Sequence, residues 1–131
     1  REYNQDKERK LMLDNLAAAR KQGALINATL VRGTHHVIDG QQPLMLKFFE
    51  TALLMRMPSG ANPAKGPVRL VSGLEKKGWI QEPSSKAVTA YTAVPAGTDP
   101  RLGWWLPSRD YAALWNEYSL NAKGTMAAAE R

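Results

Sequence analysis

Apolar residues recur at helical spacing in two stretches near the start of the chain, and a short apolar run lies between them. Residues 4–23 combine this spacing with abundant Ala, Leu, Lys and Arg, and a glycine follows the basic last turn, which predicts a helix. Residues 24–31 (ALINATLV) are β-branched and mostly apolar, as in a buried strand. Helical spacing returns from Gln42 or Pro43 to Met57, and a proline suits the first turn of a helix.

The pattern changes in the second half of the chain. Residues 58–69 hold three prolines and two glycines and predict a linker or surface loop. Beyond them, VRLVSG, KGWIQE and KAVTAYTAV have the length and composition of short strands. A third helix is predicted at 108–120, with Ser108 at its start. We therefore divide the chain into a helix–strand–helix segment at 1–57, the linker, and a β-rich segment at 70–131 that the third helix closes.

Alternation of helix, strand and helix is typical of an open α/β sheet with helices on its faces. A single strand cannot form such a sheet, so we expect residues 1–57 to need strands that this chain does not contain. The predicted fold class is therefore α/β. It comprises the C-terminal part of such a sheet with flanking helices, followed by a small β-rich segment and a closing helix.

The charge of the chain raises nucleic acid as a partner. The 131 residues carry a net charge of +6 at pH 7, with a pI near 9.8. The basic residues are spread evenly, however, because nine Lys or Arg accompany six Asp or Glu both in residues 1–60 and in residues 61–131. We interpret the charge as a solvated surface and do not expect nucleic acid as the main partner.

The sequence shows neither a membrane segment nor an export signal. No run of about 18 apolar residues occurs, and no basic and apolar signal-peptide pattern is present, so no membrane partner is expected. These patterns leave the compartment open, a periplasmic or secreted location included. The absence of cysteine excludes disulfides, thiolate catalysis and cysteine-bound metals.

The two histidines of the chain, His35 and His36, are adjacent in LVRGTHHVIDG, directly after the predicted strand. A histidine at a strand end suits proton transfer near neutral pH or metal binding. Adjacent residues on an extended chain point to opposite faces, and Asp39 is the one further ligand type nearby, so the pair is a poor zinc site. We expect no metal or other cofactor, and the pair remains a candidate for proton transfer.

The serines and aromatic residues offer less specific chemistry. None of the six serines lies in a G-x-S-x-G motif, so we interpret them as turn and cap residues. Tyr111, Trp115 and Tyr118 share one helical stripe and are assigned to packing. Trp104 and Trp105 are adjacent, and on a strand both cannot point inward. One of them is expected to line a cleft or an interface, which makes both candidate substrate-binding residues.

The stretch NLAAARKQGALINATLVRGTHHVIDGQQPLMLKFFETAL resembles the C-terminal portion of α/β-hydrolase fold enzymes. In that family a helix packs on the sheet, the last core strand runs into a turn with the catalytic histidine, and a second helix follows. Residues 5–22, 25–31, 33–36 and 42–56 look like these parts. The later GWWLPSRDYAALWNEYS is similar to the tail of some secreted or periplasmic hydrolase-like proteins.

This resemblance implies that the chain is the His-bearing C-terminal part of a serine hydrolase that acts on a small ester-like substrate. One of the two histidines would be the general base. His35 directly follows a small residue and is slightly favoured, whereas His36 has the more usual spacing to Pro43. Asp39 would be a helix cap. The family's nucleophile, oxyanion loop and acid have no counterpart here. They would come from an upstream segment or a second polypeptide, so the chain alone is expected to be inactive.

A second class of function stays open on the sequence. A non-catalytic binding module would use Trp104, Trp105 and nearby basic residues on nucleic acid or carbohydrate. A small structural subunit is the third possibility.

Overall fold

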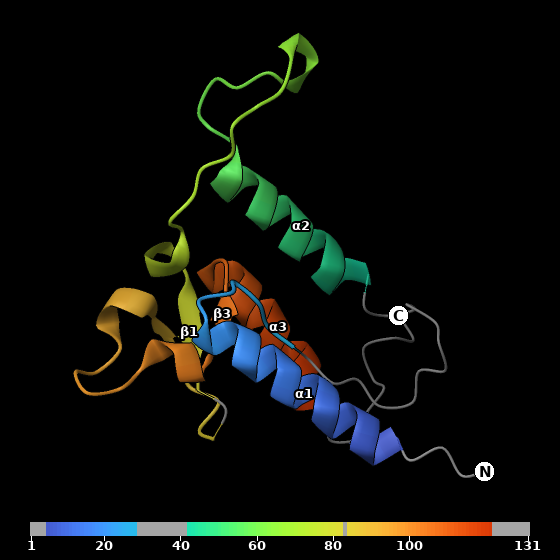
Figure 1. Ribbon diagram of the computed structural model, residues 1–131, viewed down its shortest axis with the longest axis vertical. Helices are drawn as coiled ribbons and strands as arrows, with labels where there is room; N and C mark the ends of the chain where they lie inside the picture. Colours follow the sequence, from blue (N-terminus) through green and yellow to red (C-terminus); the bar gives the residue numbers. More distant parts are fainter. Residues whose placement is uncertain (1–4, 29–41, 83, 122–131) are drawn as a thin grey trace.

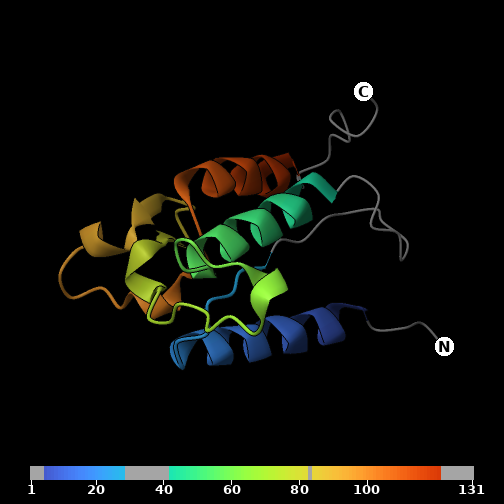
Figure 2. The ribbon, with the colours of Figure 1, turned by 90° about the horizontal axis from the view of Figure 1, so that it is seen from above.

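The computed structural model describes residues 5–28, 42–82 and 84–121. These ranges contain three α-helices, α1 (Gln5–Lys21), α2 (Gln42–Arg56) and α3 (Arg109–Asn121). Three short strands, β1 (Trp79–Gln81), β2 (Val88–Ala90) and β3 (Trp104–Leu106), form an antiparallel sheet in the order β2–β1–β3. Figures 1 and 2 show α2 alongside α3, and the sheet at one end of the helices.

The predicted α/β-hydrolase-like sheet is wrong for the described residues. The sheet is small and antiparallel, with Ile80 of β1 opposite Thr89 on one side and Trp105 on the other. A parallel sheet needs a crossover of a dozen or more residues, usually a helix, between paired strands, whereas the paired strands β1 and β2 end and begin only a few residues apart in the chain. The described residues therefore form three helices with a three-stranded antiparallel sheet at one end.

The strand predicted at 24–31 is also wrong as far as the structure describes it. Residues 24–28 are irregular and run beside β3. The Trp105 amide donates to the Ile26 carbonyl at 3.1 Å, and the Asn27 side-chain amide donates to the Trp105 carbonyl at 3.2 Å. The apolar residues of this segment are thus partly buried beside the edge of β3, but the segment is not a strand of the sheet.

The three predicted helices are confirmed, and their ends follow local signals. Gly23, with φ of +93°, follows α1 in the left-handed conformation that ends many helices. The Ser108 hydroxyl accepts a hydrogen bond from the Tyr111 amide at 3.1 Å and caps α3. Strands lie within KGWIQE and KAVTAYTAV as predicted, but VRLVSG is irregular and β3 is an additional strand.

The hydrophobic core joins α2, β3 and α3. Its buried members are Leu44, Leu106, Tyr111, Ala112 and Trp115. The predicted stripe on α3 therefore packs as expected, and burial of each large apolar side chain contributes about 1.5–3 kcal/mol. Because Leu44 from α2 shares this core with α3, the position of α2 is fixed by packing on one of its faces.

A projecting loop follows α2 in the region predicted as a linker or surface loop. We call residues 57–70 the arm, which Figure 1 shows extending beyond the end of α2 along the long axis of the molecule. The arm returns to its starting point, because the Val71 amide donates to the Arg56 carbonyl at 2.8 Å. Its tip is a short 3₁₀ turn, η1 (Pro63–Lys65), which the Asn62 side chain caps.

Candidate functional site

His35 and His36, together with Asp39, lie outside the described residues. The assignment of a catalytic base to His35 or His36 therefore stays a prediction. Within the described ranges, no three His, Cys, Asp or Glu side chains are grouped as a metal site would require. In the same ranges, no helix has the length and apolarity that a membrane crossing needs.

The adjacent tryptophans pack on opposite faces of the sheet. Trp105 is 3% exposed, and its indole Nε1 donates to the Glu75 carbonyl at 3.0 Å. Trp104 is half-buried and packs against the core cluster with Leu106. Both faces of β3 are covered in this fold, so the ring of Trp105 is closed to a substrate and Trp104 is only partly open.

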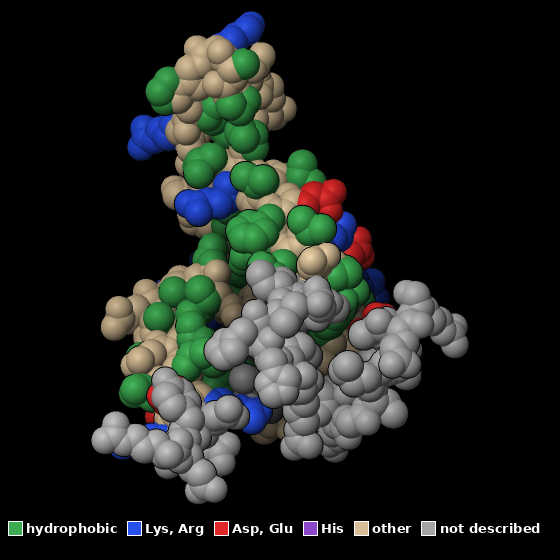
Figure 3. Space-filling view, turned by 90° about the vertical axis from the view of Figure 1, so that its right-hand side faces the viewer, with side chains coloured by type: hydrophobic (Ala, Val, Ile, Leu, Met, Phe, Trp, Pro, Cys, Tyr) green, Lys and Arg blue, Asp and Glu red, His purple; other side chains and the backbone are tan. Residues whose placement is uncertain are grey.

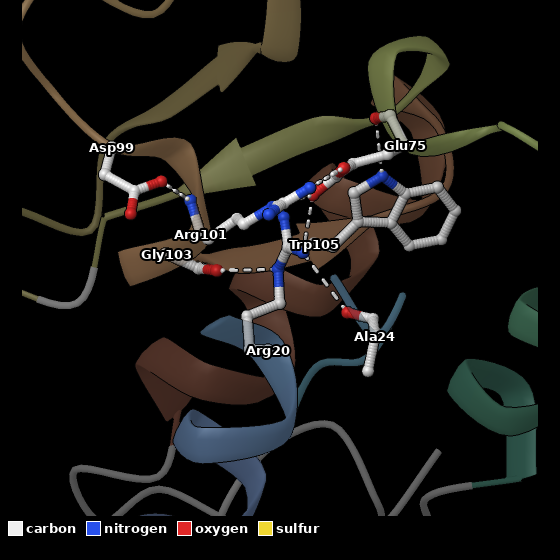
Figure 4. A network of polar contacts seen from close by, with 7 residues as sticks. All are labelled: Arg20, Ala24, Glu75, Asp99, Arg101, Gly103 and Trp105. Atoms are coloured by element: carbon white, nitrogen blue, oxygen red, sulfur yellow. Dashed lines mark hydrogen bonds and ion pairs between the residues drawn. The ribbon is translucent and has the colours of Figure 1, made fainter. Parts of the chain in front are cut away.

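A buried arginine organises the polar network that Figure 4 shows beneath Trp105. Arg20, at the end of α1, is 1% exposed. Its Nε donates to the Gly103 carbonyl at 3.1 Å, and its Nη1 donates to the Ala24 carbonyl at 3.2 Å and to Glu75 Oε1 at 3.0 Å. One side chain thus ties α1 to the segments that precede β1 and β3.

A second arginine completes the network from the outside. Arg101 lies in the 3₁₀ turn η4 (Pro100–Leu102), whose start is capped by Asp99. Its Nε and Nη2 each donate to one oxygen of Glu75 at 3.1 Å, a bidentate geometry. Glu75 begins the 3₁₀ turn η2 (Glu75–Lys77), so its carboxylate bridges η2, η4 and α1.

The lowered pKa of Glu75 supports a structural role for the network. The hydrogen bond from Arg101 lowers the pKa of Glu75 below its ordinary value of 4.5, against partial burial, and Arg20 lowers the pKa further. The pKa of Tyr111 shifts in the opposite direction. Burial raises this pKa to about 12, although the hydrogen bond that the hydroxyl donates to Asn27 opposes the rise. Both groups keep one protonation state across neutral pH.

The shifted pKa of Glu75 predicts an acid-sensitive fold. Because the pKa is lower in the folded state, the stabilisation is fully present above about pH 4.5 and is lost as pH falls through the folded-state value. We expect urea unfolding from pH 6 down to pH 3 to show a steeper loss of stability for the wild type than for Glu75→Gln. The pKa of Glu82 is lowered by its hydrogen bonds from Ser84 and Ser85. Glu82 is present in both the wild type and Glu75→Gln, so its contribution to the pH dependence is the same in both. Equal slopes would contradict the assignment.

The side of α2 that faces away from the core carries exposed apolar side chains, and neither the core nor the Arg20–Glu75–Arg101 network involves them. We call the exposed apolar side chains of this helix the outer face of α2, and they comprise Met45, Leu46, Phe49, Leu53 and Leu54. They are 40–72% exposed, and Figure 3 shows hydrophobic side chains gathered over α2. A surface helix ordinarily turns charged and polar residues to the solvent, whereas α2 is apolar on two opposite sides.

The outer face is held in place by ring contacts that lead into the core. Phe49 meets Phe48 edge to face, with ring centroids 6.1 Å apart, and Phe48 meets Tyr111 in the same manner at 5.6 Å. Along the helix, Leu46, Phe49 and Leu53 are separated by three and then four residues, the spacing of a seam between two helices. The face is therefore a preformed apolar strip on the surface of the molecule.

Sequence reasoning missed this site, although a signal was present. Apolar residues surround the helix on all sides in PLMLKFFETALLM, where the charged residues are Lys47 and Glu50 alone. A helix apolar all round is normally buried on both sides. The expected parallel sheet, which this helix was to flank, is absent from the described residues.

The fold and the site define a small mixed helical and antiparallel β domain with an exposed apolar helix face. Comparisons with protein-family models, curated proteins and solved structures find no match for this chain. The hydrolase interpretation therefore stays a prediction, without the parallel sheet that the resemblance implied.

Proposed function

We propose that this chain is a protein-interaction module that binds a partner helix on the outer face of α2. The observation that carries the proposal is the exposed apolar strip on a helix already packed on its other side. An area on the order of 500 Å² on this strip falls in the range of apolar patches that are often functional on small proteins. The proposal agrees with the second class of function considered from the sequence, a non-catalytic binding module, but its ligand is an apolar helix and not nucleic acid or carbohydrate.

The geometry favours a helix as the bound element. The strip runs along α2 for two turns, and its members project from a regular helix whose backbone hydrogen bonds are already made. Such a surface has no free strand edge to offer, so recognition relies on side chains at helical spacing. A leucine-rich helix face laid alongside α2 meets these requirements.

We expect a neutral leucine-faced helical peptide of about 18 residues, five helical turns, to bind the chain with a Kd in the micromolar range. Leu46→Gln/Leu53→Gln should abolish binding, because polar amides interrupt the apolar strip. Both side chains are more than half exposed, so the free energy of unfolding should stay within about 0.5 kcal/mol of the wild type at each site. Fluorescence anisotropy and urea unfolding measure the two quantities.

The matched control is Leu11→Gln/Leu102→Gln. These two leucines are exposed to a similar degree but lie on α1 and η4. The control should bind the peptide as the wild type does. Equal loss of binding in both double variants, or a wild type that binds no peptide, would contradict the proposed function.

A further inference from the structure

The charges that follow Glu50, at the end of α2 and on the arm, are of one sign. No acidic residue occurs between Glu50 and Glu75, whereas this stretch contains Arg56, Lys65 and Arg69. All three side chains are exposed, at the end of α2 and on the arm. The bond between the Val71 amide and the Arg56 carbonyl brings the base of the arm against the last turn of α2. Figure 3 shows Lys and Arg side chains spaced along the arm from its tip to its base, where they adjoin the hydrophobic side chains over α2.

These cations have no counterion within the described part of the chain. The described ion pairs join Lys10 to Asp14, Lys47 to Glu50, and the two network arginines to Glu75. None of them involves Arg56, Lys65 or Arg69. On α2 itself, Lys47 and Glu50 neutralise each other at 3.2 Å. The positive charge is therefore confined to one end of the strip.

We infer that the partner is an amphipathic helix with acidic residues at one end, which lie against Arg56, Lys65 and Arg69 when its apolar face covers α2. This inference rests on the proposed function and specifies the chemistry of its partner. The pairing places opposite charges at the rim of an apolar contact, where charge mainly selects the partner and orients it. The arm supplies the contact beyond the last turn of α2.

Two other occupants fit less well. A second copy of the chain carries the same net charge of +6, so self-association brings like charges together. A membrane-surface helix carries Lys and Arg along its whole polar face, whereas the polar side of α2 includes Glu50, and the unpaired cations are gathered at one end. An acidic-ended helix accounts for both the strip and the position of the charge.

The test compares two synthetic helical peptides with the same leucine face, one ending in three glutamates and the other in three lysines. At low ionic strength the glutamate peptide should bind the full chain roughly tenfold more tightly, because three exposed ion pairs of ordinary strength amount to about that factor. The preference should shrink as salt is added. In Arg56→Gln/Lys65→Gln/Arg69→Gln it should disappear, while both peptides still bind.

The control variant Arg9→Gln/Lys21→Gln/Lys86→Gln removes the same charge from exposed positions outside α2 and the arm, and it should keep the preference. Equal affinity for the two peptides would overturn the inference and leave the proposed function standing. Failure of both peptides to bind would overturn the two together. A dimer in light scattering that Leu46→Gln/Leu53→Gln dissociates, or stronger binding to phosphatidylserine vesicles than to either peptide, would replace the acidic helix by another occupant.

Discussion

Gly78→Ala is expected to lower the free energy of unfolding by about 3 kcal/mol or more, because the new methyl group overpacks a rigid site. A Cβ at Gly78 would overlap the Trp105 indole, with the ring carbon Cζ2 only 2.8 Å away. The backbone of Gly78 is extended, with φ of −91° and ψ of −169°, so the cost is purely steric. Trp105 cannot move aside, because it is 3% exposed and bonded to the Glu75 carbonyl.

Gly97→Ala is the control for loss of a glycine. Gly97 has a φ of +87° and nothing within 4 Å of an added Cβ, so its replacement should cost about 1–2 kcal/mol through the backbone alone. Urea unfolding followed by tryptophan fluorescence compares the two variants. A smaller loss for Gly78→Ala than for Gly97→Ala would show that Trp105 is not packed on this glycine.

Arg20→Met should destabilise the fold by about 3–5 kcal/mol, the usual cost of removing one partner from a buried ion pair. The methionine keeps much of the apolar stem but leaves the Ala24 and Gly103 carbonyls without their donor. It also removes one of the two cations that hold Glu75.

Arg101→Met is the matched comparison, because Arg101 binds the same carboxylate. Its side chain is 44% exposed, so solvent replaces much of what is lost and the expected cost is a small fraction of that of Arg20→Met. Equal losses for Arg20→Met and Arg101→Met in urea unfolding would mean that burial does not set the strength of this network.

Local signals made the helices predictable. The signals are the apolar periodicity of each helix, the glycine after α1 and the serine before α3. Each of these acts within a few residues, so the helices can be predicted from the sequence alone. The sheet was less predictable, because each strand has only three residues and its pairing depends on distant segments. The Ile26 carbonyl, for instance, accepts from Trp105 across most of the chain, which no local pattern encodes.

Parts of the candidate site could not be predicted from local sequence patterns, because they too depend on contacts between distant segments. Trp104 and Trp105 alternate as expected of a strand, but the covering of the Trp105 face by Glu75 and Gly78 is a tertiary contact. Arg20 had the appearance of a solvated charge in a basic last turn, and only the approach of Gly103 and Glu75 makes it a buried clamp. The apolar residues of the α2 face are visible in the sequence, but they were not singled out as a site from the sequence alone.

We propose that a partner helix lies on the outer face of α2. Amide spectra of the ¹⁵N-labelled chain, recorded during titration with the neutral leucine-faced peptide, test it most directly. We expect the largest amide chemical-shift changes, which saturate as peptide is added, at the outer face of α2, that is, at Met45, Leu46, Phe49, Leu53 and Leu54. Largest changes around Trp104, or at residues 35 and 36, with α2 unaffected, would contradict it.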